Sequence, residues 1–247
     1  MSVPQALYKS LPKRRPLSLG FDRYALHFDG LEDLVEVPHT ISLNTPNELT
    51  IGLLFKMDIV GVAYRLISKG RYDSGWDCAM SADSRLTIPY WNGLVWDNVI
   101  SNLINWVAGR WYFIYITLDA VNTTAHFYQN LNDIGVFDPP ALVSIGNTAS
   151  PVRIGTNTLN SNFLDGSVAL AVMYNRILSN WEVRRNIMDY HNPLREGLVL
   201  WLPLEEGSGL TAYDQSGQGN NGDLLPALTP PVWESLRKWE PRTEVDL

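Results

Sequence analysis

The sequence predicts an all-β protein built as a sandwich of two packed sheets, and three observations carry this prediction. Short apolar or alternating runs are separated by turn residues, which is typical of a sandwich and not of βαβ units. The length of 247 residues lies within the range in which all-β domains remain undivided. The single Cys78 excludes an internal disulfide, so apolar packing has to stabilise the fold.

The expected strands follow from local patterns of apolar residues. The run 111–118 is apolar at nearly every position, which indicates a central strand covered on both faces. Val35, Glu36 and Val37 alternate, as in a strand with one face in water. The strands are expected at 24–29, 34–37, 49–57, 64–69, 76–80, 86–90, 111–119, 123–129, 166–174 and 198–203.

One short helix is expected after the strand 166–174. Ser179 and Glu182 have the spacing of a capping box, which marks a helix N-terminus. The apolar side chains that fall on one face of this helix are Val183, Ile187 and Tyr190. The helix should end before His191 and lead the chain to a strand that completes the sheet beside the N-terminal strand.

Several segments resemble one family. Residues 24–37 (YALHFDGLEDLVEV), 109–130, 163–179 with its Tyr-Asn-Arg-x-Leu-Ser ending, and 197–224 are similar to the laminin-G-like or concanavalin-A-like jelly-roll family. The resemblance implies a jelly-roll β-sandwich of two antiparallel sheets, with one short helix and extended terminal arms. Domains of this family usually begin with a segment like 197–224, so the resemblance implies a circular permutation. A swap, in which 197–224 completes a neighbour's sheet, is the alternative.

The chain is expected to divide into a basic arm (1–20), a single permuted jelly roll (21–229) and a docking tail (230–247). The whole chain has a net charge of −7, although the arm contains only basic charged residues. An acidic body binds nucleic acid poorly, whereas a basic arm can dock on an acidic neighbour or remain solvated. The residues expected to dock on a partner are Lys9, Lys13, Arg14, Arg15, Trp233 and Trp239.

Neither a secretory signal nor a membrane span is recognised. The basic residues near the N-terminus are interleaved with prolines and lead into no apolar core of a signal peptide. The most apolar stretch, 51–64, is interrupted by Lys56 and Asp58. We therefore expect a protein made in the cytoplasm without membrane insertion.

A calcium site is one interpretation of the turn 214–222 (DQSGQGNNG). The family often holds Ca²⁺ near this loop, and the resemblance implies Asp214 with Asp29 or Asp165 as ligands. Against calcium, Ala169 and Leu170 follow Gly166 where the family usually has an acidic residue. A purely structural turn is the default expectation, and no other cofactor is predicted.

The residues favour a non-enzymatic protein. Concanavalin-A-like glycosidases need two carboxylates from alternate residues of one strand, and Glu32, Asp33 and Glu36 do not match that pattern. Cys78 has no neighbouring histidine, and His27 and His126 lie within alternating strands as ordinary face residues. The sequence also lacks a nucleophile elbow, a phosphate loop and a dinucleotide fingerprint.

A glycan site is predicted in the segment 90–98, because sugar rings stack on exposed aromatics beside amides and carboxylates. The candidate residues are Tyr90, Trp91, Asn92, Trp96 and Asp97. The alternative is that these aromatics belong to the core.

Two functions remain from the sequence. The first is a virion subunit, such as a capsid-decorating, turret or fibre protein. It would form a homo-oligomer such as a trimer, dock on neighbouring capsid or virion proteins and adhere to cell-surface glycans. Its place would be the virion, after synthesis in the host cytoplasm. The alternative is a stand-alone or exported carbohydrate-binding lectin module.

Overall fold

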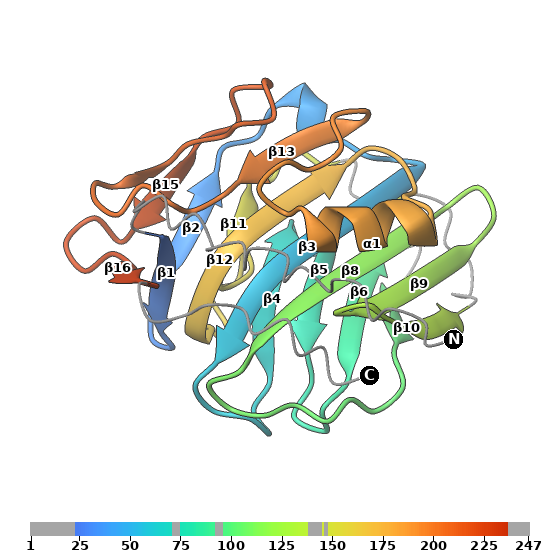
Figure 1. The fold of residues 1–247 in the computed structure, drawn as a ribbon, viewed down its shortest axis with the longest axis horizontal. Coiled ribbons are helices and arrows are strands. Elements are labelled where there is room, and N and C mark those ends of the chain that lie inside the picture. The colour runs from blue at the N-terminus through green and yellow to red at the C-terminus, as the bar shows by residue number, and fades with distance from the viewer. Residues whose placement is uncertain (1–22, 71–74, 92–95, 138–144, 146–147, 237–247) are drawn as a thin grey trace, which may run out of the picture.

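The computed structural model describes residues 23–70, 75–91, 96–137, 145 and 148–236. Two antiparallel sheets pack face to face, which confirms the predicted sandwich (Figure 1). The predicted arm (1–20) and most of the predicted tail lie outside the described residues.

The first sheet has β3 and β12 near its middle. Its strands lie in the order β10 (Asn132–Phe137), β9 (Thr124–Gln129), β8 (Trp111–Asp119), β3 (Glu48–Met57), β12 (Asp165–Tyr174), β1 (Tyr24–Asp29) and β16 (Val232–Ser235), and β13 (Leu198–Leu202) also pairs with β12. β1 and β13 occupy the same edge of β12, because β1 pairs with its first residues and β13 with its last.

The second sheet carries the remaining strands. Their order is β14 (Thr211–Ala212), β15 (Gly222–Leu225), β2 (Leu34–Val37), β11 (Val152–Ile154), β4 (Tyr64–Lys69), β5 (Trp76–Met80), β6 (Leu86–Trp91) and β7 (Trp96–Ile100). The 3-10 helix η1 (Ile41–Leu43) precedes β3. The main core lies between the two sheets, where Phe28, Phe55, Trp76 and Phe127 are fully buried.

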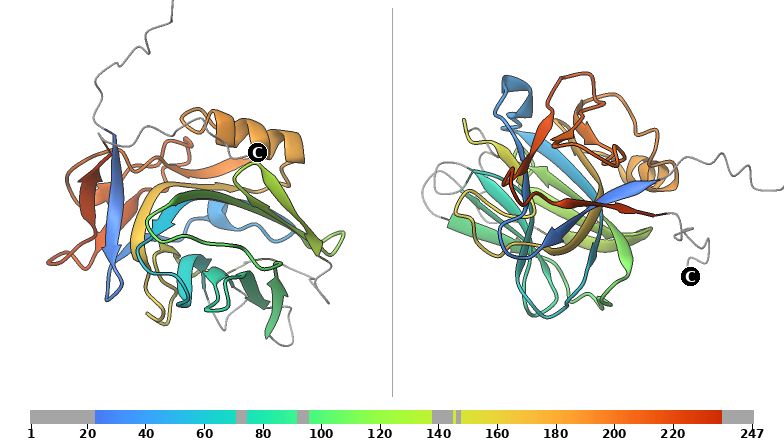
Figure 2. Two further views of the ribbon diagram at one scale, coloured as in Figure 1. Left: turned by 60° about the horizontal axis from the view of Figure 1, so that its bottom comes forward. Right: turned by 90° about the vertical axis from the view of Figure 1, so that its left-hand side faces the viewer.

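The helix α1 (Asn180–Met188) covers the outer face of the first sheet (Figure 2). The predicted capping box is present, since the Ser179 side chain accepts from the Glu182 N–H and the Glu182 carboxylate accepts from the Ser179 N–H. Val183 and Ile187 pack on Tyr115 and Tyr174 of the sheet. The predicted coverage of 111–118 on both faces is thereby confirmed, because alternate residues of β8 face the main core and α1.

Each predicted strand is present, but the short strands β7, β10, β11 and β14 to β16 were not predicted. Most are short or interrupted by polar and turn residues, so they lack a sustained apolar pattern. The late strands complete both sheets within the same chain, with β15 beside β2 and β16 beside β1. The Leu236 N–H donates to the Arg23 carbonyl at 2.7 Å, so the first and last described residues are adjacent. The circular permutation stays a prediction.

Candidate functional site

A hollow of about 290 Å³ opens where β3 begins and β12 ends. Three loops supply its walls: the segment between η1 and β3, the turn between β8 and β9, and the first residue after β12. The lining residues are Asn44, Thr45, Pro46, Asn47, Glu48, Val121 and Asn175. The lining is therefore mixed, with asparagine amides and the Glu48 carboxylate beside an equal share of apolar surface.

Local hydrogen bonds hold these walls in place. The Asn44 N–H closes η1 by donating to the Ile41 carbonyl at 3.2 Å, and the Ala120 N–H donates to the Asn47 carbonyl at 2.8 Å. Asp119 accepts from the backbone N–H groups of Val121 and Asn122, both at 2.9 Å. Burial alone would raise the pKa of Asp119, but hydrogen bonds from Asn122 and Val121 outweigh burial and lower that pKa. Asp119 therefore stays ionised and stabilises the turn.

Two buried oxygens of the hollow lack a hydrogen-bond partner in the described structure. These are the Asn44 Oδ1 atom and the Thr45 Oγ atom, and Thr45 is only 1% exposed. Buried polar atoms are normally satisfied, and an unsatisfied one carries a desolvation penalty. Both atoms are enclosed by the protein, so they lie behind the open surface of the hollow.

The structure brings only some of the predicted glycan-binding residues together at the surface. Tyr90 is fully buried in the main core, so its ring cannot stack on a ligand in solution. Burial and the neighbouring Asp97 carboxylate raise the pKa of Tyr90. Trp91 is half-buried and lies opposite Trp96 across the hairpin of β6 and β7. Asn92 and the Trp96 side chain lie outside the described residues.

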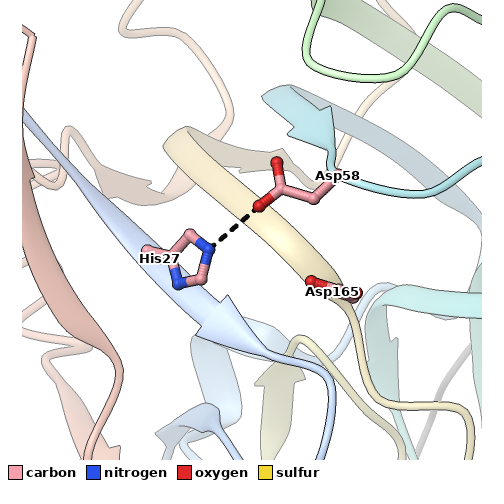
Figure 3. A group of neighbouring side chains, drawn as sticks. All are labelled: His27, Asp58 and Asp165. Carbon is pink, nitrogen blue, oxygen red and sulfur yellow. Dashed lines mark hydrogen bonds and ion pairs between the residues drawn. The ribbon is translucent and has the colours of Figure 1, made fainter.

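A second group of side chains lies at the opposite ends of β3 and β12. His27 of β1, Asp58 just after β3 and Asp165 at the start of β12 place one nitrogen and two carboxylate oxygens within 4.8 Å of one another (Figure 3). The His27 Nε2 atom lies 3.0 Å from an Asp58 carboxylate oxygen. The Asp58 N–H donates to the Asp165 carbonyl at 3.0 Å, which fixes the two segments side by side.

Further carboxylates surround this group. Asp29 and Asp165 are direct partners in the pairing of β1 with β12. The buried Asp33 accepts from the Asp29 N–H at 3.0 Å. Burial, partly offset by that hydrogen bond, raises the pKa of Asp33 to about 6, and the nearby Asp29 and Glu32 charges add to the rise. This end of the sheet is therefore strongly acidic around one histidine.

Of the calcium ligands implied by resemblance, Asp29 and Asp165 are neighbours, whereas Asp214 lies elsewhere. The Asp214 carboxylate accepts the N–H of Trp201 at 2.9 Å, and Trp201 pairs with Val172, seven residues along β12 from Asp165. That separation corresponds to about 23 Å along a strand. Both Asp214 oxygens also accept bonds within the turn, from Ser216 and Asn220.

The expected docking residues are mostly outside the described part of the chain. Lys9, Lys13, Arg14, Arg15 and Trp239 all lie there. Trp233 packs against the main core, and its Nε1–H donates to the Gly209 carbonyl at 3.0 Å. Within the described ranges, no helix has the length and apolar character needed to cross a membrane.

The sequence predicts neither the hollow nor the His27 group, because each is assembled from segments distant in the chain. One local signal does point to the second group. His27 and Asp29 alternate on one face of a strand, and Asp165 precedes Gly166, a residue that allows close approach of two backbones.

Comparison with known proteins identifies the family to which this fold is similar. The sequence model of the concanavalin A-like lectin/glucanases superfamily matches residues 29–184. A Bacteroides ovatus protein, described as a candidate carbohydrate-binding protein, superposes with a TM-score of 0.64 at 14% identity, over 82% of this chain and 58% of that one. This chain thus spans less than two thirds of that relative.

Two smaller structures also share the fold. The CBM40 of the Ruminococcus gnavus IT-sialidase has a TM-score of 0.51 at 14% identity, over 65% of this chain and 96% of that one. A heptameric SAP-like pentraxin from Limulus polyphemus has a TM-score of 0.50 at 14% identity, over 67% of this chain and 82% of that one. None of the curated proteins matches this sequence significantly.

Proposed function

This chain belongs to the concanavalin A-like lectin/glucanases superfamily, and we propose that it is a non-enzymatic carbohydrate-binding module whose saccharide site is the hollow at the start of β3. The observation that carries this proposal is the hollow itself, whose lining includes the three asparagines Asn44, Asn47 and Asn175. Saccharide hydroxyls donate to and accept from amides, and the amide groups of Asn47 and Asn175 can both donate and accept.

The charge of the hollow favours neutral saccharides. Among the described residues, its lining contains one carboxylate, Glu48, and no basic side chain. A sialylated glycan would bring a second negative charge to this rim, and like charges in proximity repel. We therefore expect uncharged oligosaccharides to bind more tightly than their sialylated counterparts.

The carboxylates closest to a hydrolase pattern have other partners, which supports a binding role. Glu36 forms an ion pair with Arg153 at 2.7 Å, and Glu32 accepts from the Thr229 hydroxyl at 3.1 Å. Asp33 is buried and bonded to the Asp29 backbone. These three do not form the pair of facing carboxylates that glycoside hydrolysis requires.

A glycan array followed by calorimetry on the purified chain tests this proposal. We expect a neutral saccharide to bind, and we expect Asn175→Ala and Asn47→Ala to weaken its binding about 10-fold each through lost hydrogen bonds. The matched control is Gln218→Ala, an exposed amide of the 214–222 turn, which should leave affinity unchanged. Absence of binding to every glycan would overturn the function, and loss in Trp91→Ala alone would move the site to the β6–β7 hairpin.

A second candidate role, a self-associating virion subunit, is supported by the edge of the first sheet. β16 is the outermost strand on its side of the described sheet, and the nearby Leu228 and Val232 are 97% and 64% exposed. Open strand edges with apolar side chains favour pairing with another chain. Light scattering on the full chain and on a chain lacking 1–20 should give a defined oligomer. A monomer in both would contradict this role.

A further inference from the structure

The group formed by His27, Asp58 and Asp165 has the donor composition of a metal site. It offers one imidazole nitrogen and two carboxylate oxygens, all within 4.8 Å of one another, from three segments of the first sheet (Figure 3). The described residues contain two further histidine–carboxylate pairs, His126 with Asp133 and His191 with Glu205, but only the group at His27 includes a third ligand.

The carboxylate of Asp165 accepts no hydrogen bond from the described residues, although it is half-buried. Its immediate neighbours are Asp58, Asp29 and His27, so negative charge predominates there. The nearest lysine on this face, Lys56, is already paired with Glu234 at 3.2 Å. A bound cation would offset this accumulation of charge.

A buried hydroxyl beside the group is also without a partner. Ser167 is 0% exposed, and its Oγ atom makes no hydrogen bond in the described structure. Ser167 lies directly opposite His27 in the pairing of β1 with β12, and two residues along β12 from Asp165. Partners across a ladder and alternate residues along a strand share a face, so this hydroxyl faces the same side of the sheet as the group. Metal-bound carboxylates and waters commonly accept such outer hydrogen bonds.

Two glycines hold the ligand-bearing segments close together. A Cβ atom on Gly166 would lie 2.2 Å from the Lys56 carbonyl oxygen, so only glycine lets β12 approach β3 this closely. Gly30, at φ +78°, packs against the Asp165 side chain, and a Cβ there would lie 3.0 Å from the Asp165 Cβ. The positions of Asp58 and Asp165 are therefore set by backbone packing before any ligand binds.

We propose that His27, Asp58 and Asp165 bind a divalent first-row transition-metal ion, with Zn²⁺ as the probe that matches these donors. Imidazole with carboxylates suits Zn²⁺, whereas Ca²⁺ takes six to eight oxygens. Zinc ligands lie about 2.0 to 2.2 Å from the ion, so tetrahedral donors are about 3.4 Å apart. A donor pair at the 4.8 Å limit therefore has to close by up to roughly 1.4 Å. Asp58, whose side chain is 38% exposed, has room to make that movement.

Three protein ligands leave one coordination position for water or an external ligand. The ion would join β1, β3 and β12 at one end of the sheet and neutralise the carboxylates that surround His27. The site therefore stabilises the folded chain when metal is bound, independently of any saccharide at the other end of β3.

The test uses the full, untagged chain, so that its own histidines are the only ones present. We expect calorimetry to show saturable 1:1 binding of Zn²⁺, a rise in melting temperature with Zn²⁺, and visible absorption bands of a four-coordinate site with Co²⁺. His27→Gln and Asp58→Asn should each weaken binding about 10- to 100-fold. Ca²⁺ should not compete at equal concentration.

The matched control is His126→Gln, which removes the other strand histidine paired with an aspartate and should leave Zn²⁺ affinity unchanged. Melting without metal shows whether each variant is folded. Asp58 is exposed, so Asp58→Asn provides a folded variant even if His27→Gln is unstable. Unsaturable binding by the wild-type chain, or equal affinity in Asp58→Asn and the wild type, would overturn the site. Neither result bears on saccharide binding at the hollow.

Discussion

The two ends of β3 differ in chemistry although the same strand carries both. Glu48 begins β3 at the amide-lined hollow, and Asp58 follows its last residue at the acidic group around His27. Ten residues of strand separate the two by about 30 Å. β12 runs antiparallel beside β3 and joins the same two regions, with Asn175 at one end and Asp165 at the other. One rigid pair of strands thus presents neutral hydrogen-bonding groups at one end and charged groups at the other.

The difference indicates which ligands each end can bind. Neutral amides match uncharged hydroxyl groups, because no net charge has to be desolvated. Clustered carboxylates around an imidazole match a cation, whose charge compensates their repulsion. Changes confined to one end should therefore leave ligand binding at the other end intact.

The largest loss of stability is expected from Gly166→Ala, which disrupts the packing of β12 on β3 at the acidic end. The new Cβ would meet the Lys56 carbonyl oxygen at 2.2 Å, so β12 has to move away from β3. We expect a loss of about 3 kcal/mol or more in the free energy of unfolding, measured by denaturant titration. The control is Gly61→Ala, at φ +78° with open space around it, which should cost about 1 kcal/mol. Equal costs for the two variants would contradict the close packing of β12 on β3.

A smaller, pH-dependent effect is expected from Asp33→Asn. The pKa of Asp33 is raised from 3.8 to about 6 in the folded chain. The protonated Asp33 therefore contributes fully to the free energy of unfolding below about pH 4, and this contribution is lost as the pH rises through 6. Asparagine cannot ionise, so the variant should gain stability relative to the wild type over that window, by about 2 kcal/mol.

Unfolding free energies at a series of pH values measure this difference. Asparagine can still accept the Asp29 N–H, so the comparison isolates the charge. A difference in unfolding free energy between the two chains that is constant from pH 4 to 7 would contradict the prediction. It would show that Asp33 ionises in the folded chain without loss of stability.

The sequence predicts the sandwich and most of its long strands, because the apolar runs and the capping box of Ser179 with Glu182 are local signals. It predicts the binding residues less well. Tyr90 is of a residue type that often stacks on sugar rings. In the sheet, however, β6 pairs with β5 and the Tyr90 ring is buried in the core. The hollow depends on the approach of Asn44, Val121 and Asn175 from three loops, and no spacing in the sequence encodes that approach.

The most direct test of the central claim is amide NMR of the ¹⁵N-labelled chain during separate titrations with a bound neutral saccharide and with Zn²⁺. The account predicts two sets of shifted resonances that do not overlap: Asn44, Thr45, Asn47 and Asn175 with saccharide, and His27, Asp58, Asp165 and Ser167 with Zn²⁺. Saccharide shifts centred on Trp91 and Asp97, or shifts from both ligands at the same end of β3, would contradict it.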